Sequence, residues 1–368
     1  MVSHFPLDWN GAGVTLNEVP MIRVENLNKS FSGKRVLKDI EFEVSKGEFF
    51  VIVGYSGSGK STLLRILAGL ETPESGKVFF DGEDVTNLPP QKRRIGMVFQ
   101  DYAVWPHMTV RKNIEFVLQG DHTALANRDE VVKELLKKVG LMDKIDSMPS
   151  QLSGGQLQRV ALARALAVKP KILLMDEPLS NLDRQVKKNL QLEILSITRN
   201  LNITTLFVTH DQEEAQLLSD RIAVMNAGVI EQIGDQKTFY YDPVNNTVAG
   251  FMDEIITFRG HVNAEKNSAY NVTINGREIT VSQINKSKVT IGADCMVSVR
   301  IGDLKINDNG WINGTVVSDK FYSGSNHLIV SLEDGSTINI VVEETVSMQY
   351  GSPVRLSPAD NRAFLFTE

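Results

Sequence analysis

The chain has 368 residues, of which 42% are apolar and 23% are charged, so its composition is that of an ordinary globular protein. This composition excludes a wholly disordered chain, a collagen-like fibre and a disulfide-rich scaffold, and the length predicts two or three domains. The 39 basic and 45 acidic residues give a net charge of −6, which makes non-specific binding to nucleic acid a poor candidate function.

Predicted strands and helices alternate in the N-terminal part of the chain. Residues 1–20 contain scattered Gly and Pro without a period, and we expect a flexible leader there. From residue 21 to residue 242, apolar runs predict strands at 22–24, 49–53, 171–175 and 203–208, and helical spacing predicts helices at 61–70, 156–167, 186–201 and 212–218. Such alternation predicts an α/β domain with a largely parallel core.

After residue 257, short β-branched runs replace the helical periodicity. Asn275-Gly276 lies between two such runs, and Asp334-Gly335 lies between two others, so each pair predicts a hairpin turn. Many short strands joined by turns predict a small barrel or sandwich over residues 257–368. We expect a linker between the two domains over residues 243–256, where the chain passes from one pattern to the other.

Two features of the whole chain bear on its location. The single cysteine, Cys295, cannot form an internal disulfide, which fits a reducing compartment. No apolar run approaches the roughly 20 residues of a membrane-spanning helix, and the N-terminus has no basic segment followed by an apolar core. We therefore expect a cytosolic protein whose role at a membrane depends on a partner.

Residues 54–61, with the sequence GYSGSGKS, match the pattern of a phosphate-binding loop between a strand and a helix. Gly57 and Gly59 allow the backbone to turn its N–H groups around anionic oxygens, next to a helix N-terminus. Lys60 can reach the β and γ phosphates, and Ser61 offers a hydroxyl to Mg²⁺. The predicted nucleotide-binding residues of this segment are Gly54, Ser56, Gly57, Ser58, Gly59, Lys60, Ser61 and Thr62.

Two acids follow the predicted strand at 171–175. A buried acid beside a phosphate needs a cation, so Asp176 suits the coordination shell of Mg²⁺. Glu177 points to the other face if the strand stays extended, and it could polarise a water for attack on the γ-phosphate. The pair therefore predicts a metal ligand and a general base.

Residues 152–156, with the sequence LSGGQ, form a second candidate anion site. Ser153 is a good helix cap, and Gly154 and Gly155 expose N–H groups just before the helix predicted from Gln156 onward. We include Ser153, Gly154, Gly155 and Gln156 among the predicted nucleotide-binding residues.

With these motifs in this order, residues 21–242 resemble the ATPase cassette of the ATP-binding-cassette (ABC) family, whose hallmark is the signature at 152–156. The resemblance implies an α/β P-loop NTPase cassette with a mixed sheet and a helical subdomain, which hydrolyses ATP with Mg²⁺. Two cassettes of this family meet head to tail. The resemblance thus implies that Ser153 and Gly155 contact the γ-phosphate of ATP held by a second copy of the chain or by a related subunit.

The same resemblance implies roles for four residues outside these motifs. Gln100 matches the glutamine that senses the metal and the attacking water, and His210 matches the histidine that contacts the γ-phosphate. Asp183 matches a position at the dimer interface. Phe31 matches the aromatic residue that stacks on adenine, where tyrosine is commoner and phenylalanine keeps the same π face.

Other segments resemble solute importers of bacteria and archaea. Residues 101–110 resemble the surface that receives a coupling helix of the membrane permease, and we expect exposed Tyr102, Trp105 and Met108 there. Residues 299–304 depart from the Arg-Pro-Glu-Asp motif that is common in the importers' OB-like, transport-associated domain but retain its Arg300 and Asp303. Residues 351–358 resemble the closing strand of that domain. The resemblance implies that residues 257–368 form such a regulatory domain.

An importer of this kind implies integral-membrane permease subunits and an extracytoplasmic solute-binding protein as partners. The chain would then lie at the cytoplasmic face of the plasma membrane, as a peripheral subunit. We expect a sugar as the transported solute, with a polyamine, ferric iron or an oxyanion as alternatives.

A second class of function is a non-transport ABC ATPase that acts on nucleic acid or ribosomes, since an OB-like barrel can bind single strands. Residues 257–368 carry 10 basic and 12 acidic residues and few aromatic ones. The chain also lacks a second cassette. We therefore expect no nucleic-acid partner.

Overall fold

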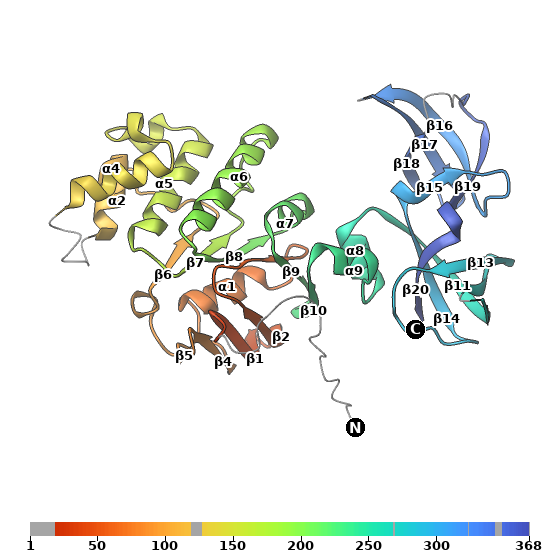
Figure 1. Cartoon of the computed structure of the whole chain (residues 1–368), viewed down its shortest axis with the longest axis horizontal. Coiled ribbons are helices and arrows are strands. Elements are labelled where there is room, and N and C mark those ends of the chain that lie inside the picture. Colours follow the sequence, from red (N-terminus) through yellow and green to blue (C-terminus); the bar gives the residue numbers. More distant parts are fainter. Residues whose placement is uncertain (1–18, 119–126, 268, 323, 343–347, 368) are drawn as a thin grey trace. The chain divides into compact units, whose positions relative to one another are not determined.

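Figure 1 shows the computed structural model, which describes residues 19–118, 127–267, 269–322, 324–342 and 348–367. Contacts divide the chain into two compact units. The first unit consists of Met1–Glu48 and Ser61–Leu206, and the second of Phe49–Lys60 and Phe207–Glu368. Most of the expected leader, residues 1–18, lies outside the described residues.

An antiparallel sheet opens the first unit. Its strand order is β2-β1-β4-β5, with β1 (Ile22–Phe31), β2 (Lys34–Val44), β4 (Ser75–Phe80) and β5 (Glu83–Asp84). Val24 of β1 lies opposite Phe42 of β2 and Val78 of β4. All three side chains are buried, so cross-strand contacts between branched and aromatic residues stabilise this sheet.

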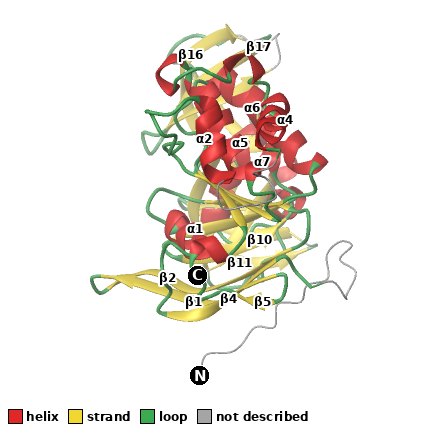
Figure 2. Cartoon of the chain, turned by 90° about the vertical axis from the view of Figure 1, so that its left-hand side faces the viewer, coloured by secondary structure: helices red, strands yellow, loops and turns green. Residues whose placement is uncertain are grey.

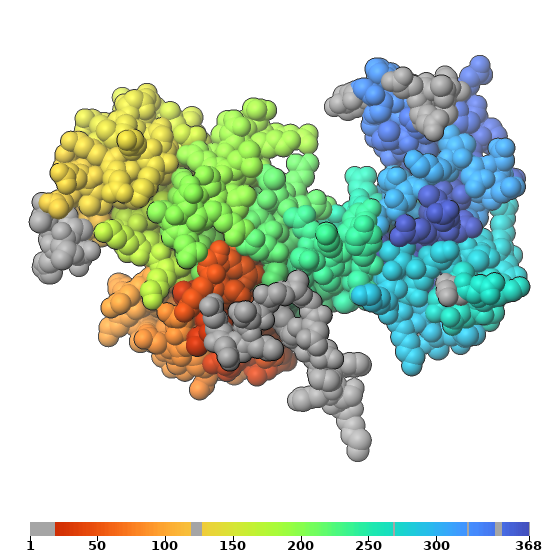
Figure 3. All heavy atoms as spheres, in the orientation of Figure 1, coloured from red at the N-terminus to blue at the C-terminus, as the bar shows by residue number. Residues whose placement is uncertain are grey.

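Five helices of eight or more residues make up much of the rest of the described first unit. They are α1 (Lys60–Ala68), α2 (Val110–Val117), α4 (Arg128–Lys138), α5 (Gly154–Ala167) and α6 (Arg184–Asn200). The first residue of α1, Lys60, is assigned to the second unit, and the rest of α1 to the first. Helices α2, α4 and α5 pack against one another, and Figure 2 shows them on the opposite side of this unit from β1, β2 and β4. Ile114, Leu136 and Val160 are fully buried, one on each of these three helices. Figure 3 shows the atoms of this part of the chain in yellow and yellow-green.

A mixed sheet carries the phosphate-binding segment. Its strand order is β10-β9-β3-β8-β7-β6, with β3 (Phe49–Val53), β6 (Ile95–Val98), β7 (Ile172–Asp176), β8 (Thr204–Thr209), β9 (Arg221–Asn226) and β10 (Val229–Gly234). β3 is parallel to β9 and β6 to β7, whereas β10 is antiparallel to β9. Every residue of β3, β7 and β8 is buried, as expected for parallel strands covered on both faces. The predicted mixed sheet is confirmed.

Three short helices follow in the second unit, namely α7 (Gln212–Leu218), α8 (Gln236–Tyr241) and α9 (Asn246–Met252). Helix α9 lies within residues 243–256, where the sequence predicts a linker. Asn245 caps this helix by accepting a hydrogen bond from the Val248 N–H, and Phe251 is buried. Seven residues are too few for helical periodicity to stand out in the sequence.

The C-terminal part of the second unit is built from strands. A closed barrel has the order β11-β12-β13-β20-β14, with β11 (Ile255–Lys266), β12 (Ala269–Ile274), β13 (Arg277–Gln283), β14 (Asp294–Arg300) and β20 (Arg362–Thr367). A separate sheet has the order β15-β19-β16-β17-β18, with β15 (Leu304–Ile306), β16 (Ile312–Tyr322), β17 (Ser325–Leu332), β18 (Thr337–Val342) and β19 (Pro353–Pro358). The all-β prediction is confirmed, and the five-stranded barrel is consistent with an OB-like domain. The separate sheet was not predicted.

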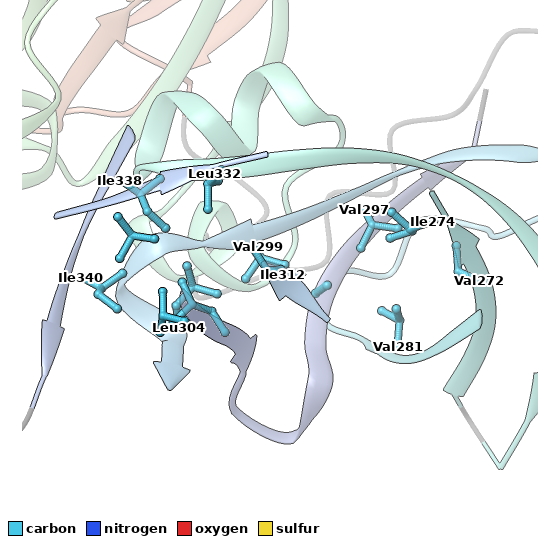
Figure 4. Packing of buried hydrophobic residues seen from close by; sticks show 14 of the residues in the cluster. Val272, Ile274, Val281, Val297, Val299, Leu304, Ile312, Leu332, Ile338 and Ile340 are labelled. Carbon is cyan, nitrogen blue, oxygen red and sulfur yellow. The ribbon is translucent and has the colours of Figure 1, made fainter. Parts of the chain in front are cut away.

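Both predicted hairpins are present in these sheets. Asn275 and Gly276 have φ of 48° and 76° and join β12 to β13, as a two-residue turn with left-handed residues requires. Gly335 has φ of 83° in the turn between β17 and β18. One cluster of buried aliphatic side chains extends through the barrel and the separate sheet, and Figure 4 shows Val272 and Val297 of the one and Ile312 and Ile340 of the other.

The buried thiol of Cys295 makes the stability of this β-rich part depend on pH. Burial and the nearby Asp294 charge raise the pKa of the thiol from 9.0 to about 11. The folded and unfolded thiols are both protonated below pH 9. Between pH 9 and 11 only the unfolded thiol ionises, so the fold loses stability as the pH rises, by about 2–3 kcal/mol from this group.

We expect the unfolding free energy of Cys295→Ala to fall less steeply over this pH range than that of the unchanged chain. Urea denaturation at several pH values, followed by tryptophan fluorescence, measures the difference between the two slopes. The substitution also leaves a small cavity, but the cost of that cavity does not depend on pH. Equal slopes would contradict the prediction.

Candidate active site

The phosphate-binding segment joins β3 to α1 and depends on glycine at its first residue. A Cβ at Gly54 would lie 2.0 Å from the carbonyl oxygen of Met225 in β9, so a side chain cannot fit. Gly57 and Gly59 have φ of 81° and 107°, which other residues rarely adopt. The tight turn therefore follows from the glycine spacing. The hydroxyl of Ser58 in this turn is buried and has no hydrogen-bond partner among the described residues.

Lys60 is the first residue of α1, and its side chain is 4% exposed. Its ammonium donates hydrogen bonds to the carbonyl oxygens of Gly54 at 2.7 Å and Tyr55 at 3.0 Å. These two carbonyls hold the cation beside the start of its own loop. A positive charge fixed at the N-terminus of a helix is suited to bind an anion.

The fold brings Ser61 and Asp176 together, although they lie 115 positions apart. The Ser61 hydroxyl donates a hydrogen bond to Asp176 Oδ1 at 2.9 Å. Asp176 ends the buried strand β7 and is only 6% exposed. A hydroxyl and a buried carboxylate are oxygen donors of the type that hard divalent cations prefer.

Glu177 does not continue the strand, and the expectation of an extended chain at this position is wrong. Its φ is 42°, in the left-handed region that costs a non-glycine residue about 1–2 kcal/mol. The Ser180 hydroxyl donates to the Glu177 carbonyl oxygen at 3.0 Å. The direction of Glu177 is therefore set by this turn at the end of β7 and not by the alternation of side chains along a strand. Unfavourable backbone conformations of this kind cluster at functional sites.

Hydrogen bonds connect Gln100 to the segment after Glu177. Gln100 Nε2 donates to the Ser180 hydroxyl at 3.4 Å, and Asn181 Nδ2 donates to the Gln100 carbonyl oxygen at 3.3 Å. Ser180 therefore contacts both Glu177 and Gln100. Sequence reasoning missed this role of Ser180, because nothing in the sequence pairs residues 80 positions apart.

The signature segment begins helix α5. The Ser153 hydroxyl accepts from the Gln156 N–H at 3.4 Å, and Gln156 Oε1 accepts from the Ser153 N–H at 2.9 Å, which is a capping box. A Cβ at Gly154 would approach Leu182 to 3.0 Å, and a Cβ at Gly155 would approach Val186 to 2.8 Å. Both glycines thus allow the signature segment to pack closely on Leu182 and on Val186 of α6.

Three other predicted residues lie at the ends of elements. His210 follows β8 and is exposed. Asp183 caps α6 by accepting from the Val186 N–H at 3.1 Å, a role that sequence reasoning did not assign to it. Phe31 ends β1 with 44% of its surface exposed, and the Lys29 ammonium lies 5.0 Å from the centre of its ring. Ser56 and Thr62 lie in the phosphate-binding loop and in α1, respectively.

Known proteins are similar to this chain over most of its length. A family model described as ABC transporter matches residues 37–180. The chain is 37% identical over 355 residues to the Fe(3+) ions import ATP-binding protein FbpC of Fusobacterium nucleatum, covering 94% of this chain and 93% of that protein. It is 41% identical over 329 residues to the spermidine/putrescine import ATP-binding protein PotA of Salmonella typhi, covering 87% of this chain and 86% of that protein. The chain belongs to the ATP-binding subunits of ABC importers.

Solved structures agree with this assignment to an ABC ATPase. The ATP-binding cassette MJ0796, in a dimeric post-hydrolysis state bound to ADP and Pi, is 31% identical with a TM-score of 0.53 and covers 58% of this chain and 98% of that chain. The protein cbiO1 from Clostridium perfringens, part of the ABC transporter complex cbiONQ, is 30% identical with a TM-score of 0.57 and covers 61% and 91%. No helix in the described part of this ABC ATPase is long and apolar enough to cross a membrane.

The expected permease-contact surface of this ABC ATPase is less exposed than the sequence suggests. Tyr102, Trp105 and Met108 are half-buried. The centre of the Trp105 ring lies 4.5 Å from that of the Phe116 ring on α2. The guanidinium of Arg164, which is on α5, lies 3.9 Å from the centre of the Trp105 ring. These contacts with α2 and α5 cover part of the Trp105 ring, and no feature of the sequence indicates the Arg164 contact.

Proposed function

We propose that the chain drives solute import by hydrolysing Mg-ATP between the phosphate-binding loop of one copy and the signature segment of a second copy. The hydrogen bond between Ser61 and Asp176 carries this proposal, because it places the hydroxyl that follows the loop lysine beside the buried carboxylate that ends β7. The exposed phosphate-loop residue Ser56 and the exposed His210 are both accessible to a nucleotide. The dimeric state of the solved cassette MJ0796 supports a second copy as the partner.

The binding residues divide the work by their chemistry. Lys60 attracts the β and γ phosphates, and Phe31 offers its exposed ring to adenine. Ser61, Asp176 and Gln100 would hold Mg²⁺, which when bound neutralises charge on the phosphates. Their oxygen donors fit this ion.

The catalytic residues act on the attacking water and on the charge that develops at the γ-phosphate. Glu177 accepts a proton from the water, and His210 contacts the γ-phosphate. In the head-to-tail dimer, Ser153 to Gln156 of the second copy bind the same phosphate through the start of a helix, with Asp183 at the dimer interface.

We place the permease contact at the surface formed by Tyr102, Trp105, Met108 and Phe116. Phe116 is 43% exposed on α2. A cavity of about 140 Å³ is lined by Tyr102, Val117 and Arg164 among others. Tyr102 and Ala103 both have positive φ, which marks a backbone segment held out of its preferred conformation. An apolar coupling helix of a permease fits such a surface, and this contact would hold the chain at the cytoplasmic face of the membrane.

The transported solute is better proposed as a cation than as a sugar. The two relatives described above are named for ferric ions and for spermidine or putrescine, and both solutes are positively charged. The expectation of a sugar has no support from them. We infer that the solute is ferric iron or a polyamine, delivered to the permease by an extracytoplasmic solute-binding protein.

Affinity purification of the tagged chain from its native membranes, followed by mass spectrometry, tests the transport function. We expect recovery of a multi-span permease, and loss of this permease with Phe116→Glu at unchanged ATPase activity. Leu192→Glu, at a residue that is 55% exposed on α6, serves as the control and should retain the permease. Recovery of only ribosomal or nucleic-acid-binding proteins would refute the transport function. Uptake of labelled iron and spermidine by the recovered system then identifies the solute.

A further inference from the structure

The C-terminal β-rich part contains a cavity of about 200 Å³, and no residue of the proposed ATPase site lines it. Four segments line it: β11, the β12–β13 hairpin, the start of β16, and the end of β17 with the turn that follows. Its apolar wall is formed by Phe258, Ile274, Ile279, Trp311, Ile312 and Leu332. Figure 4 labels Ile274, Ile312 and Leu332 within the core cluster. The rings of Phe258 and Trp311 meet edge to face at 5.0 Å, so this wall is rigid and aromatic.

Charged side chains of both signs line the same cavity. Arg277 lies at the start of β13, and Glu333 and Asp334 lie in the turn after β17. Within the described part of the chain, the Arg277 guanidinium forms no ion pair with either acid, although all three residues face one space. An arginine that lines a cavity without a carboxylate partner can bind one from a ligand.

The two acids are positioned by neighbouring groups. Glu333 Oε1 accepts a hydrogen bond from Asn313 Nδ2 at 2.7 Å. Asp334 Oδ1 accepts from the Ser336 hydroxyl at 2.6 Å and from its N–H at 2.8 Å. These bonds hold the pKa of the Asp334 carboxyl below its usual range, so it is ionised at neutral pH. A fixed negative charge thus lines the cavity as well as the positive charge of Arg277.

We propose that this cavity binds a small zwitterion, an α-amino acid with an apolar side chain. The ligand carboxylate pairs with Arg277, its ammonium pairs with Glu333 and Asp334, and its side chain packs on Phe258 and Trp311. An anion without a positive group would be repelled by the two acids, and a polyamine would be repelled by the arginine. The cavity volume equals that of roughly six or seven water molecules, which suits a single amino acid.

Isothermal titration calorimetry of the full chain with L-leucine, L-methionine and L-phenylalanine tests the proposal. We expect saturable binding of at least one of them. Isoamylamine and 4-methylpentanoate are analogues of leucine that each lack one of its charges. Each should bind at least about tenfold more weakly than leucine, because it loses one charge-assisted hydrogen bond. Spermidine and inorganic phosphate are included as ligands of a single charge sign.

Variants separate this site from general effects on folding. Arg277→Ala and Glu333→Gln should each weaken binding at least about tenfold, with thermal unfolding close to that of the unchanged chain. Lys305→Ala, at an exposed residue of β15, should bind normally. No heat from any of the three amino acids up to millimolar concentration would overturn the proposal, and so would equal binding of a single-charge analogue. The readout does not depend on transport or on ATP hydrolysis, so it stands apart from the test of the proposed function.

Discussion

Replacing Glu177 by Gln should lower steady-state ATP hydrolysis by about 10²- to 10⁴-fold, the usual contribution of a general base, and leave ATP binding nearly unchanged. The amide keeps the size of the carboxylate but cannot accept the proton of the attacking water. Because ATP then persists at the site, a dimer that contains ATP should accumulate. Phosphate release measures turnover, a fluorescent ATP analogue measures binding, and size-exclusion chromatography with ATP measures the dimer.

The control for this prediction is Glu83→Gln, at an exposed glutamate of β5, which should hydrolyse ATP at the normal rate. The unfavourable φ of Glu177 is the same for Gln, so the substitution leaves the backbone cost as it was. Unchanged phosphate release by Glu177→Gln would remove this residue from its proposed role. Loss of binding together with turnover would instead indicate that Glu177 holds the loop in place.

The parts of the site that could be predicted from the sequence are those whose chemistry is local. The strand, glycines and helix of residues 49–68 adjoin one another, so each element supports the interpretation of the next. The capping box of Ser153 and Gln156 likewise spans only four residues. Asp176 and Glu177 could be proposed as functional, but the turn that redirects Glu177 depends on Ser180 and its neighbours and could not be anticipated.

The partners of Arg300 could not be predicted from the sequence. Its match to a family motif indicates a domain, but gives no physical reason for an arginine. In the structure Arg300 is 5% exposed, lies 3.6 Å from the Tyr240 ring centre and pairs with Asp253 at 3.3 Å and Asp303 at 3.7 Å. It thereby connects α8 and the end of α9 to the barrel. Asp303 lies only three residues away, but Tyr240 and Asp253 come from distant parts of the chain, and no local pattern identifies them as partners of this buried charge.

Lys60→Ala should weaken ATP binding and turnover together. The ammonium is the cation placed at the start of the loop, and the loss of a charge-assisted bond to phosphate should cost about 10- to 100-fold in affinity. Turnover at saturating ATP should fall by a further 10²- to 10³-fold, since the same charge stabilises the transition state. A fluorescent ATP analogue and phosphate release measure the two effects.

The buried position of Lys60 calls for a separate check of folding. Removing the ammonium leaves the carbonyl oxygens of Gly54 and Tyr55 without this donor, which could loosen the loop even without nucleotide. Thermal unfolding in the absence of ATP therefore distinguishes a damaged loop from a lost phosphate contact. Lys34→Ala, at an exposed lysine of β2, is the control for the loss of one positive charge. Normal affinity of Lys60→Ala for the ATP analogue would mean that the loop backbone and helix α1 bind the phosphates without the lysine.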